Sequence, residues 1–230
     1  MTTFRVIDIE TTGMEPPAEI IEIGWQDVIA DEQGVRLGAT GSALYGVLNG
    51  IPPETMAVHH ITPAMVRGCP PCLRFDVDGV IAGADVLVAH NAAFEAQWFT
   101  PEICAAVPFL CTLKAASRVW PEAPGHSNSV LRYWLGHDLH DRAMPPHRAQ
   151  PDAYVTAHIL LSLLERASAA DMLAWTQEPR VMPTCPIGKF RGRPWAEVEA
   201  GFLNWMLAQA TMEADLKWNA RRELDRRAAA

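Results

Sequence analysis

The apolar positions along the chain follow two periods, and each period predicts a different kind of element. Runs rich in β-branched residues predict strands over residues 4–10, 19–29, 35–48, 85–90 and 109–111. Helical spacing predicts helices over residues 73–81, 92–99, 113–120, 127–135 and 149–167, and a helix or loop from residue 51. The first three strands predict an antiparallel meander. The alternation that follows indicates an α/β fold with a mixed sheet flanked by helices.

Residues at the predicted helix starts support these boundaries. Thr112 and Ser127 each precede a helical segment, and their hydroxyl groups are suited to accept hydrogen bonds from the first turn. Pro63 and Pro151 are placed to lie in first turns, where a proline lacks only an amide hydrogen that the helix does not use. We therefore expect a short helix at Pro63 and the longest helix from about Ala149.

Three prolines between Pro179 and Pro186 mark the best candidate for a linker. They divide the chain into a body of residues 1–178 and a small, mainly helical appendage of residues 179–230. The body holds 10 basic and 21 acidic residues, whereas the appendage holds 9 basic and 6 acidic residues. A basic appendage beside an acidic body is compatible with a substrate that has a phosphate backbone, although a bias of this size is commonly only a solvated surface.

Composition limits the environments in which the chain can work. The 230 residues are 49% hydrophobic, which is enough for a sizeable core, yet no apolar run is long enough to cross a membrane. The start lacks the basic-then-apolar pattern of a secretory signal, and the five cysteines lack regular spacing. The net charge of −8 argues against indiscriminate binding of polyanions. We expect a cytoplasmic protein with reduced thiols and no membrane partner.

Asp8 and Glu10 are the most informative polar residues, since they end the first apolar run two positions apart. The period of a strand points both side chains to the same face. Unpaired buried carboxylates are costly, and a hard divalent cation such as Mg²⁺ or Mn²⁺ removes that cost. The pair therefore predicts half of a metal site, although alone it would often be a solvated pair at a strand end.

Two further segments carry polar residues where predicted helices start. His90, Asn91 and Glu95 follow a short strand, and Glu95 is expected in the first turn of a helix, where the helix dipole favours an anion. His147 and Asp152 are arranged in the same manner at the start of the long helix, with Asp152 facing the sheet. Taken alone, a histidine such as His147 is more often a surface or capping residue.

Other residues allow interpretations that are weaker. Cys69 and Cys72 frame two prolines, but no second cysteine pair completes a zinc site, and the His-x-Glu element of a nucleobase deaminase is absent. Two ordinary thiols are favoured. Trp120, Trp134 and Trp205 could stack on bases, but packing in the core is favoured.

The chain resembles the DEDDh-type 3′–5′ exonuclease family of the ribonuclease H-like superfamily in three ordered segments, which are Asp8-x-Glu10, His90-Asn-Ala-Ala-Phe-Glu95 and His147-x-x-x-x-Asp152. The likeness covers about residues 4–165. Arg148 stands where the tyrosine subclass has its tyrosine, so the histidine subclass fits. Segments that begin at residues 55, 111 and 188 are similar to the exodeoxyribonuclease X branch. The resemblance implies a ribonuclease H-like mixed five-stranded sheet and an exonuclease domain over residues 1–178.

The resemblance also implies roles for individual residues. The catalytic set would be His147 with four carboxylates, which are Asp8, Glu10, Glu95 and Asp152. The carboxylates would hold two Mg²⁺ (or Mn²⁺) ions, and His147 would deprotonate the attacking water, because imidazole titrates near neutral pH. The terminal nucleotide would be bound by Thr11, Thr12, Gly13, Met14, Val58, His59, Asn91 and Phe94.

Glu95 departs from the family pattern, which usually has Asp at this position. Its carboxylate lies one methylene further out, so the second metal site would have looser geometry or a preference for Mn²⁺. The leading hypothesis is an exonuclease that releases nucleoside 5′-monophosphates from single-stranded DNA or DNA 3′ ends, in repair or proofreading. The alternatives are an exoribonuclease that acts on RNA ends and a degenerate fold that binds nucleic-acid ends or a partner protein. A homodimer is left open.

Overall fold

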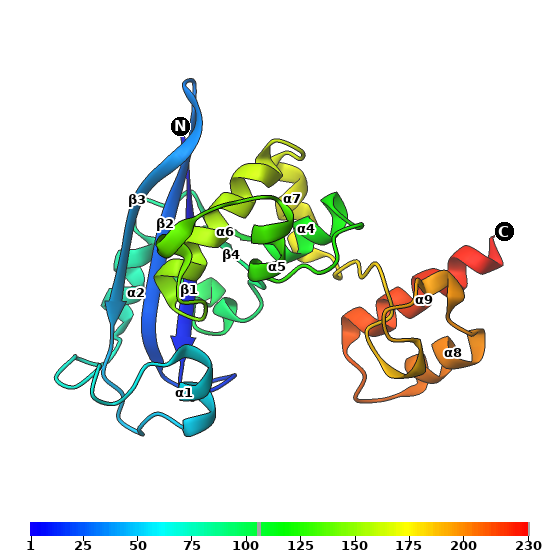
Figure 1. Cartoon of the computed structure of the whole chain (residues 1–230), viewed down its shortest axis with the longest axis horizontal. Coiled ribbons are helices and arrows are strands. Elements are labelled where there is room, and N and C mark those ends of the chain that lie inside the picture. The colour runs from blue at the N-terminus through cyan, green and yellow to red at the C-terminus, as the bar shows by residue number, and fades with distance from the viewer. Residues whose placement is uncertain (105–106, 230) are drawn as a thin grey trace.

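The computed structural model describes residues 1–104 and 107–229, and its centre is a five-stranded mixed sheet (Figure 1). The strands are β1 (Thr2–Thr11), β2 (Ile20–Asp31), β3 (Gly34–Leu44), β4 (Val86–Ala89) and β5 (Phe109–Cys111). Their order in the sheet is β3-β2-β1-β4-β5. β1, β2 and β3 form an antiparallel meander, whereas β4 and β5 run parallel to β1. The predicted α/β fold and its five strands are therefore confirmed.

Helices connect these strands and cover the sheet. In the body they are α1 (Pro53–His59), α2 (Arg74–Ile81), α3 (Pro101–Cys104), α4 (Thr112–Val119), α5 (Asn128–Trp134), α6 (Ala149–Leu164) and α7 (Ala169–Gln177), with 3-10 turns η1 (Glu95–Gln97) and η2 (His140–Ala143). The predictions for α2, α4, α5 and α6 are confirmed to within a few residues. Ser127 caps α5 as predicted, because its Oγ accepts a hydrogen bond from the backbone N of Val130. None of the described helices is long and apolar enough to span a bilayer.

Two hydrophobic layers pack on the sheet, one on each face. Phe4 and Val6 of β1 belong to the core under α4, α5, α6 and α7, whereas Ile7 and Ile9 belong to the core under α2 and α3. Since alternate residues of a strand share a face, Asp8 and Glu10 continue the face that α6 covers. They lie at the carboxyl end of β1, beside the end of the parallel strand β4. Figure 1 shows α6 lying along this face.

The prediction of a helix over residues 92–99 is wrong. The backbone at Asn91 has a φ of 73°, and the chain forms a tight turn followed by the single 3-10 turn η1. The backbone N of Phe94 donates a hydrogen bond to the carbonyl O of Asn91, and the backbone N of Ala96 donates one to the carbonyl O of Ala92, so these bonds close the turns. Consecutive turns bring every third or fourth residue to one side, which is why their sequence imitates helical spacing.

Two other local predictions also require correction. Residues around Pro63 form hydrogen-bonded turns rather than a short helix, and Gly68, with a φ of 83°, ends them. Thr112 is the first residue of α4 rather than its cap, because its Oγ1 lies 3.3 Å from the carbonyl O of Ala89 and 2.9 Å from Nδ1 of His90. Its hydroxyl thus ties α4 to the end of β4.

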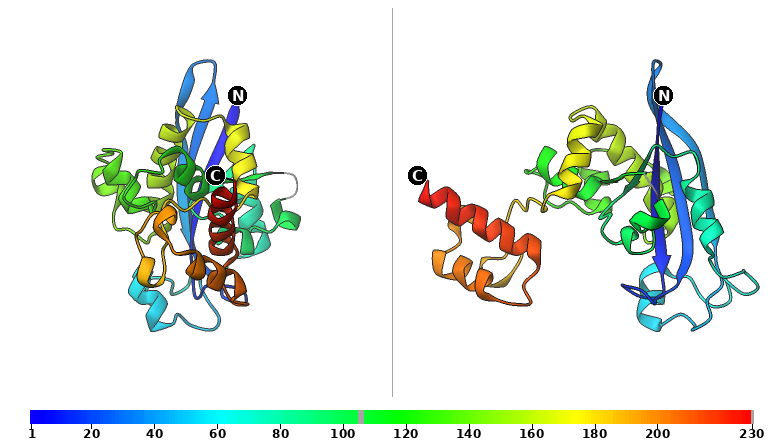
Figure 2. Two further views of the ribbon diagram at one scale, coloured as in Figure 1. Left: turned by 90° about the vertical axis from the view of Figure 1, so that its right-hand side faces the viewer. Right: turned by 180° about the vertical axis from the view of Figure 1, so that it is seen from behind.

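The C-terminal residues form a separate small core. It is built from η3 (Gly188–Phe190), η4 (Trp195–Glu197), α8 (Ala200–Ala208), α9 (Ala214–Ala228) and the segment before them. Trp195 packs there and donates its indole N–H to the carbonyl of Met182 at 2.7 Å. Figure 2 shows α8 and α9 set apart from the sheet. The division at residue 178 stays a prediction.

The three tryptophans weighed as base-stacking residues differ in burial. Trp120 packs in the core of the body, as predicted, and its ring meets the edge of Trp134. Trp134 is 38% exposed, and Trp205, on α8, is 48% exposed. Packing in the core therefore explains Trp120, as predicted, but it does not explain the exposed surface of Trp134 and Trp205.

Candidate active site

Three carboxylates meet at the carboxyl end of β1. Oxygen atoms of Asp8, Glu10 and Asp152 all lie within 4.8 Å of one another. Asp8 and Glu10 come from the α6 face of β1, and Asp152 comes from the first turn of α6. Residues from opposite ends of the body are therefore brought together, as the sequence predicted for a metal site.

The segment before α6 brings His147 to the same place. The backbone N of His147 donates a hydrogen bond to Oδ2 of Asp152 at 2.9 Å. His147 itself adopts a left-handed conformation with a φ of 60°, which is unusual for a residue with a side chain. His147 lines the pocket that contains the carboxylates. The loop is thus folded back so that the histidine and the aspartate share one site.

Burial and mutual repulsion raise the pKa values of these carboxyl groups. Burial raises the pKa of Asp8 well above its ordinary range, and the neighbouring charges of Asp152 and Glu10 raise it further. Burial and the charges of Asp152 and Glu22 raise the pKa of Glu10 to about 8. Burial also raises the pKa of Asp152, and the charge of Glu22 raises it further. A bound divalent cation would favour the ionised forms that burial and repulsion oppose.

Glu95 reaches the site from η1 rather than from a helical first turn. Its side chain is 3% exposed, and burial raises its pKa to about 8. Glu95 and Asp8 are close enough for the charge of Glu95 to raise the pKa of Asp8, but Glu95 is outside the group of three carboxylates. Among the described residues, its Oε2 atom is buried without a hydrogen-bond partner. Such an oxygen is suited to a cation or a water molecule.

A cavity of about 560 Å³ joins these groups. Seven of the eight residues predicted to bind the nucleotide line it, namely Thr11, Gly13, Met14, Val58, His59, Asn91 and Phe94. Thr12 does not line it, because its backbone and Oγ1 pair with the backbone of Glu19 and close the loop after β1. Met14 and Val58 are 78% and 48% exposed, so they form an apolar rim.

His59 lines this cavity and has one ring nitrogen without a partner among the described residues. Its Nδ1 accepts a hydrogen bond from the backbone N of Ile61 at 2.9 Å, and burial lowers its pKa. A neutral ring that accepts at Nδ1 carries its proton at Nε2. Within residues 1–104 and 107–229, that Nε2 atom is buried and has no acceptor. The buried Nε2–H is therefore a donor without an acceptor among the described residues.

Several residues around the site were not predicted. Ile9, Glu54, Thr55 and His90 line the cavity, and Glu22 lies buried next to it, paired with Arg148. His90 is held through both ring nitrogens, by Thr112 and by the carbonyl of His126. Glu22 could have been identified from the sequence, because it is a charged residue between isoleucines in the apolar run of β2.

Comparisons with known proteins agree with this geometry. A family model described as Exonuclease matches residues 6–160. Exodeoxyribonuclease 10 of Escherichia coli strain K12 is 33% identical over 210 residues, which cover 88% of this chain and 89% of that protein. The structure of exonuclease X in complex with 5′ overhanging duplex DNA matches with a TM-score of 0.60 and 30% identity, over 75% of this chain and 99% of that chain.

A more distant structure shares the fold alone. E. coli exonuclease I in complex with a dA16 oligonucleotide has a TM-score of 0.60 at 16% identity, over 79% of this chain and 44% of that chain. The family match spans most of the chain and includes all three carboxylates of the cluster. The chain therefore belongs to the DEDDh 3′–5′ exonuclease family, whose members are phosphodiester hydrolases.

Proposed function

We propose that the protein is a divalent-metal-dependent exonuclease that removes nucleoside 5′-monophosphates from the 3′ ends of DNA, preferring single-stranded ends. The observation that carries the proposal is the meeting of Asp8, Glu10 and Asp152 beside His147 in one cavity. The similarity to exodeoxyribonuclease 10 and to a nuclease solved with duplex DNA supports DNA as the substrate. A cavity of about 560 Å³ can accept one nucleotide.

The donor set fits divalent cations. Asp8, Glu10 and Asp152 offer hard oxygen ligands within 4.8 Å of one another, and Glu95 offers a buried oxygen without a partner among the described residues. We infer that the first three would hold one ion and that Asp8 with Glu95 would hold a second. Two Mg²⁺ or Mn²⁺ ions supply charge stabilisation for the attacking and leaving oxygens of phosphodiester hydrolysis.

The remaining residues of the cavity would orient the substrate and move protons. His147, next to Asp152, would accept the proton of the attacking water. His59 lines the cavity and would contact the terminal nucleotide. The apolar side chains of Met14 and Val58 at the rim would hold the terminal base away from its neighbour.

End-labelled oligonucleotides test the proposal. A single-stranded DNA labelled at its 5′ end should shorten stepwise in the presence of Mg²⁺ or Mn²⁺, and thin-layer chromatography of 3′-labelled DNA should identify the first product as a 5′-mononucleotide. Duplexes with 3′ overhangs and with recessed 3′ ends, and a matched RNA, define the preferred substrate. DNA that stays intact with both metals would contradict the proposal, and faster RNA cleavage would make RNA the natural substrate.

The setting of this activity also remains a proposal. We propose a role in DNA repair or proofreading in the cytoplasm, which the five free cysteines support. Whether the protein forms a homodimer is a question for light scattering in solution.

A further inference from the structure

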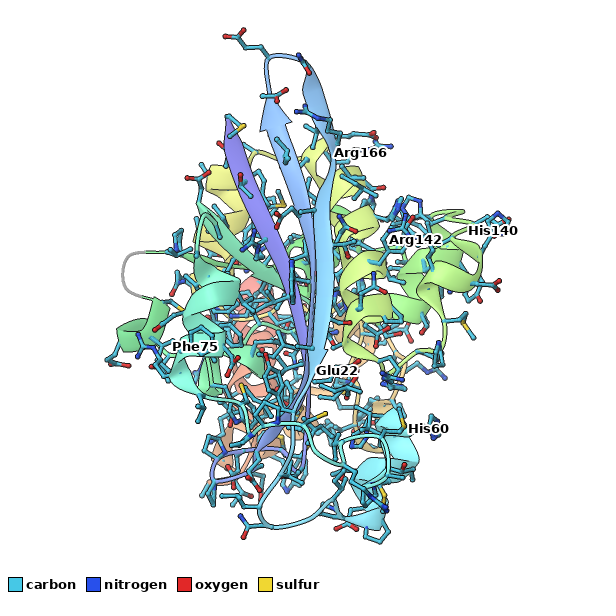
Figure 3. All side chains as sticks on the ribbon, turned by 90° about the vertical axis from the view of Figure 1, so that its left-hand side faces the viewer. Glu22, His60, Phe75, His140, Arg142 and Arg166 are labelled. Carbon is cyan, nitrogen blue, oxygen red and sulfur yellow. The ribbon has the colours of Figure 1, made fainter. Side chains whose placement is uncertain are left out.

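Glu22 is a buried carboxylate beside the pocket that the proposed chemistry leaves unused. It is 3% exposed and lies on β2 directly across from Glu10, so its side chain is on the α6 face. Its oxygens accept hydrogen bonds from Nη2 and Nε of Arg148 at 2.7 and 2.8 Å, and one also accepts from the backbone N of Ala149 at 3.0 Å. Figure 3 labels Glu22 on the sheet, with the pale green ribbon of α6 beside it.

Gly24 provides a second contact on the same face of β2. A side chain at this position would overlap the backbone of Ala149 and Gln150, so the first turn of α6 lies directly on the strand. The start of α6 is thus fixed at two points, by close backbone contact at Gly24 and by three hydrogen bonds at Glu22. Two fixed points determine the orientation of that turn.

These contacts fix the backbone between two residues of the active site. Arg148 follows His147 directly and is bound to Glu22, while the N of His147 is bound to Asp152. A left-handed backbone such as that of His147 is strained and persists only where its surroundings impose it. The pairing of Arg148 on one side and of Asp152 on the other imposes this conformation.

Stability alone does not explain the pair. A buried ion pair contributes little net stability, because desolvation of both charges offsets their attraction. Glu22 also adds negative charge next to Glu10, where carboxylates already repel one another. A planar guanidinium that binds a carboxylate through two hydrogen bonds instead provides a fixed geometry. The pair is therefore better explained by the position that it enforces.

We propose that Glu22 and Arg148 are positioning residues of the active site. The pair fixes the segment from His147 to Asp152 against β2, so that the imidazole and the carboxylates keep the arrangement that hydrolysis needs. This inference rests on the proposed function. It assigns to Glu22 a role in turnover rather than in substrate contact, since Glu22 does not line the cavity.

A matched pair of variants tests the inference in the full chain. Glu22→Gln breaks the bidentate pair, and Asp27→Asn breaks a second buried pair, in which Asp27 accepts hydrogen bonds from Nε and Nη2 of Arg5 at 2.7 and 2.9 Å across the same two strands. Both variants should lower the thermal midpoint. Only Glu22→Gln should lower kcat on end-labelled DNA, by about 10- to 100-fold with KM changed less than about 3-fold, as for residues that orient metal ligands.

The outcomes separate this inference from the proposed function. An inactive wild-type protein would contradict the proposed function itself. An active wild type with unchanged kcat in Glu22→Gln, or an equal loss in Asp27→Asn, would overturn the positioning role. If Glu22→Gln does not fold, Arg148→Lys decides, because it keeps the charge but loses the bidentate geometry. A reduced kcat of Arg148→Lys at an unchanged thermal midpoint supports the positioning role, and a kcat of this variant equal to that of the wild type overturns it.

Discussion

Crowded carboxylates at the end of β1 make the metal-free protein sensitive to pH. Burial raises the pKa of Glu10 and of Glu95 from an ordinary value of 4.5 to about 8. Between those values the folded protein binds protons that the unfolded chain has lost, so stability falls as pH rises. Burial lowers the pKa of His90 and of His158 from 6.5 to about 4, which has the opposite effect, but that effect weakens above pH 6.5 and is small by about pH 7.5.

We therefore expect the thermal midpoint in EDTA to fall between about pH 7 and pH 8. Mn²⁺ should raise the midpoint more at pH 8 than at pH 6.5, because the ion binds the ionised carboxylates. Differential scanning calorimetry measures both trends. A Glu10→Gln, Glu95→Gln double variant is the control and should show a flatter dependence on pH. A rising midpoint in EDTA across this range would be the contrary result.

Removing Asp152 should abolish turnover while leaving the protein folded. Asp152→Ala removes one carboxylate of the cluster and the acceptor that binds the N of His147. We expect kcat on end-labelled DNA to fall by more than about 100-fold, with the circular dichroism spectrum unchanged. Cleavage at a normal rate would show that the cluster is not the catalytic site.

Shortening Glu95 should keep or improve activity. Glu95→Asp restores the residue that the family usually has, at a buried position near Asp8. We expect equal or higher kcat and a smaller preference for Mn²⁺ over Mg²⁺, measured on the same DNA substrate. A large loss would mean that the site has adapted to the longer side chain. Glu95→Gln, which keeps the length but removes the charge, serves as the matched comparison.

Individual active-site residues were predictable where ordered motifs carry them. Strand period placed Asp8 and Glu10 on one face, and the family resemblance implied that Asp152 joins them, as the structure shows. The pairing of Glu22 with Arg148 could not be predicted, because it depends on the register between β1 and β2 and on the position at which α6 packs against β2. Thr12 was placed in the cavity, but its hydroxyl instead accepts a hydrogen bond from the backbone of Glu19.

At the scale of elements, the contact between β2 and α6 decides the geometry of the site. Gly24→Ala adds a methyl group that would overlap the backbone of Ala149 and Gln150. We expect a loss of about 2 kcal/mol or more in the free energy of unfolding, together with lower kcat. Urea denaturation measures the first effect. Gly79→Ala, on α2 with open space around it, is the control and should not destabilise the protein.

Element predictions succeeded where periodicity was long and failed where turns were tight. The strands of the meander and the sixteen-residue helix α6 have patterns that packing on the sheet reinforces. In the segment after β4, the positive φ of Asn91 starts a turn, and the hydrogen bonds that follow close separate turns rather than a continuous helix. Glu95 was therefore assigned to the wrong element, although it lines the cavity.

At the scale of the whole molecule, the basic appendage is predicted to contact the phosphate backbone. Lys189 and Arg193 form exposed ion pairs with Glu199 and Glu197, and such pairs are weak enough to exchange partners. Neutralising Lys189, Arg191 and Arg193 to Gln should reduce the slope of log Kd against log salt by about 1 to 3.

Fluorescence anisotropy with a labelled DNA measures that slope. The control is Arg166→Gln, at a residue that follows the end of α6 opposite to Asp152 and is labelled apart from Glu22 in Figure 3. The control should keep the wild-type slope. An unaltered slope in the triple variant would exclude a backbone contact by this segment, and equal changes in both variants would indicate a general charge effect.

Binding of the catalytic cations by the carboxylates at the start of α6 is the step on which the proposed hydrolysis depends. Anomalous diffraction from crystals grown with Mn²⁺ tests it most directly. We expect two anomalous peaks, one among Asp8, Glu10 and Asp152 and one beside Asp8 and Glu95. Crystals without anomalous signal at these residues, with carboxylates turned away from one another at millimolar Mn²⁺, would contradict it.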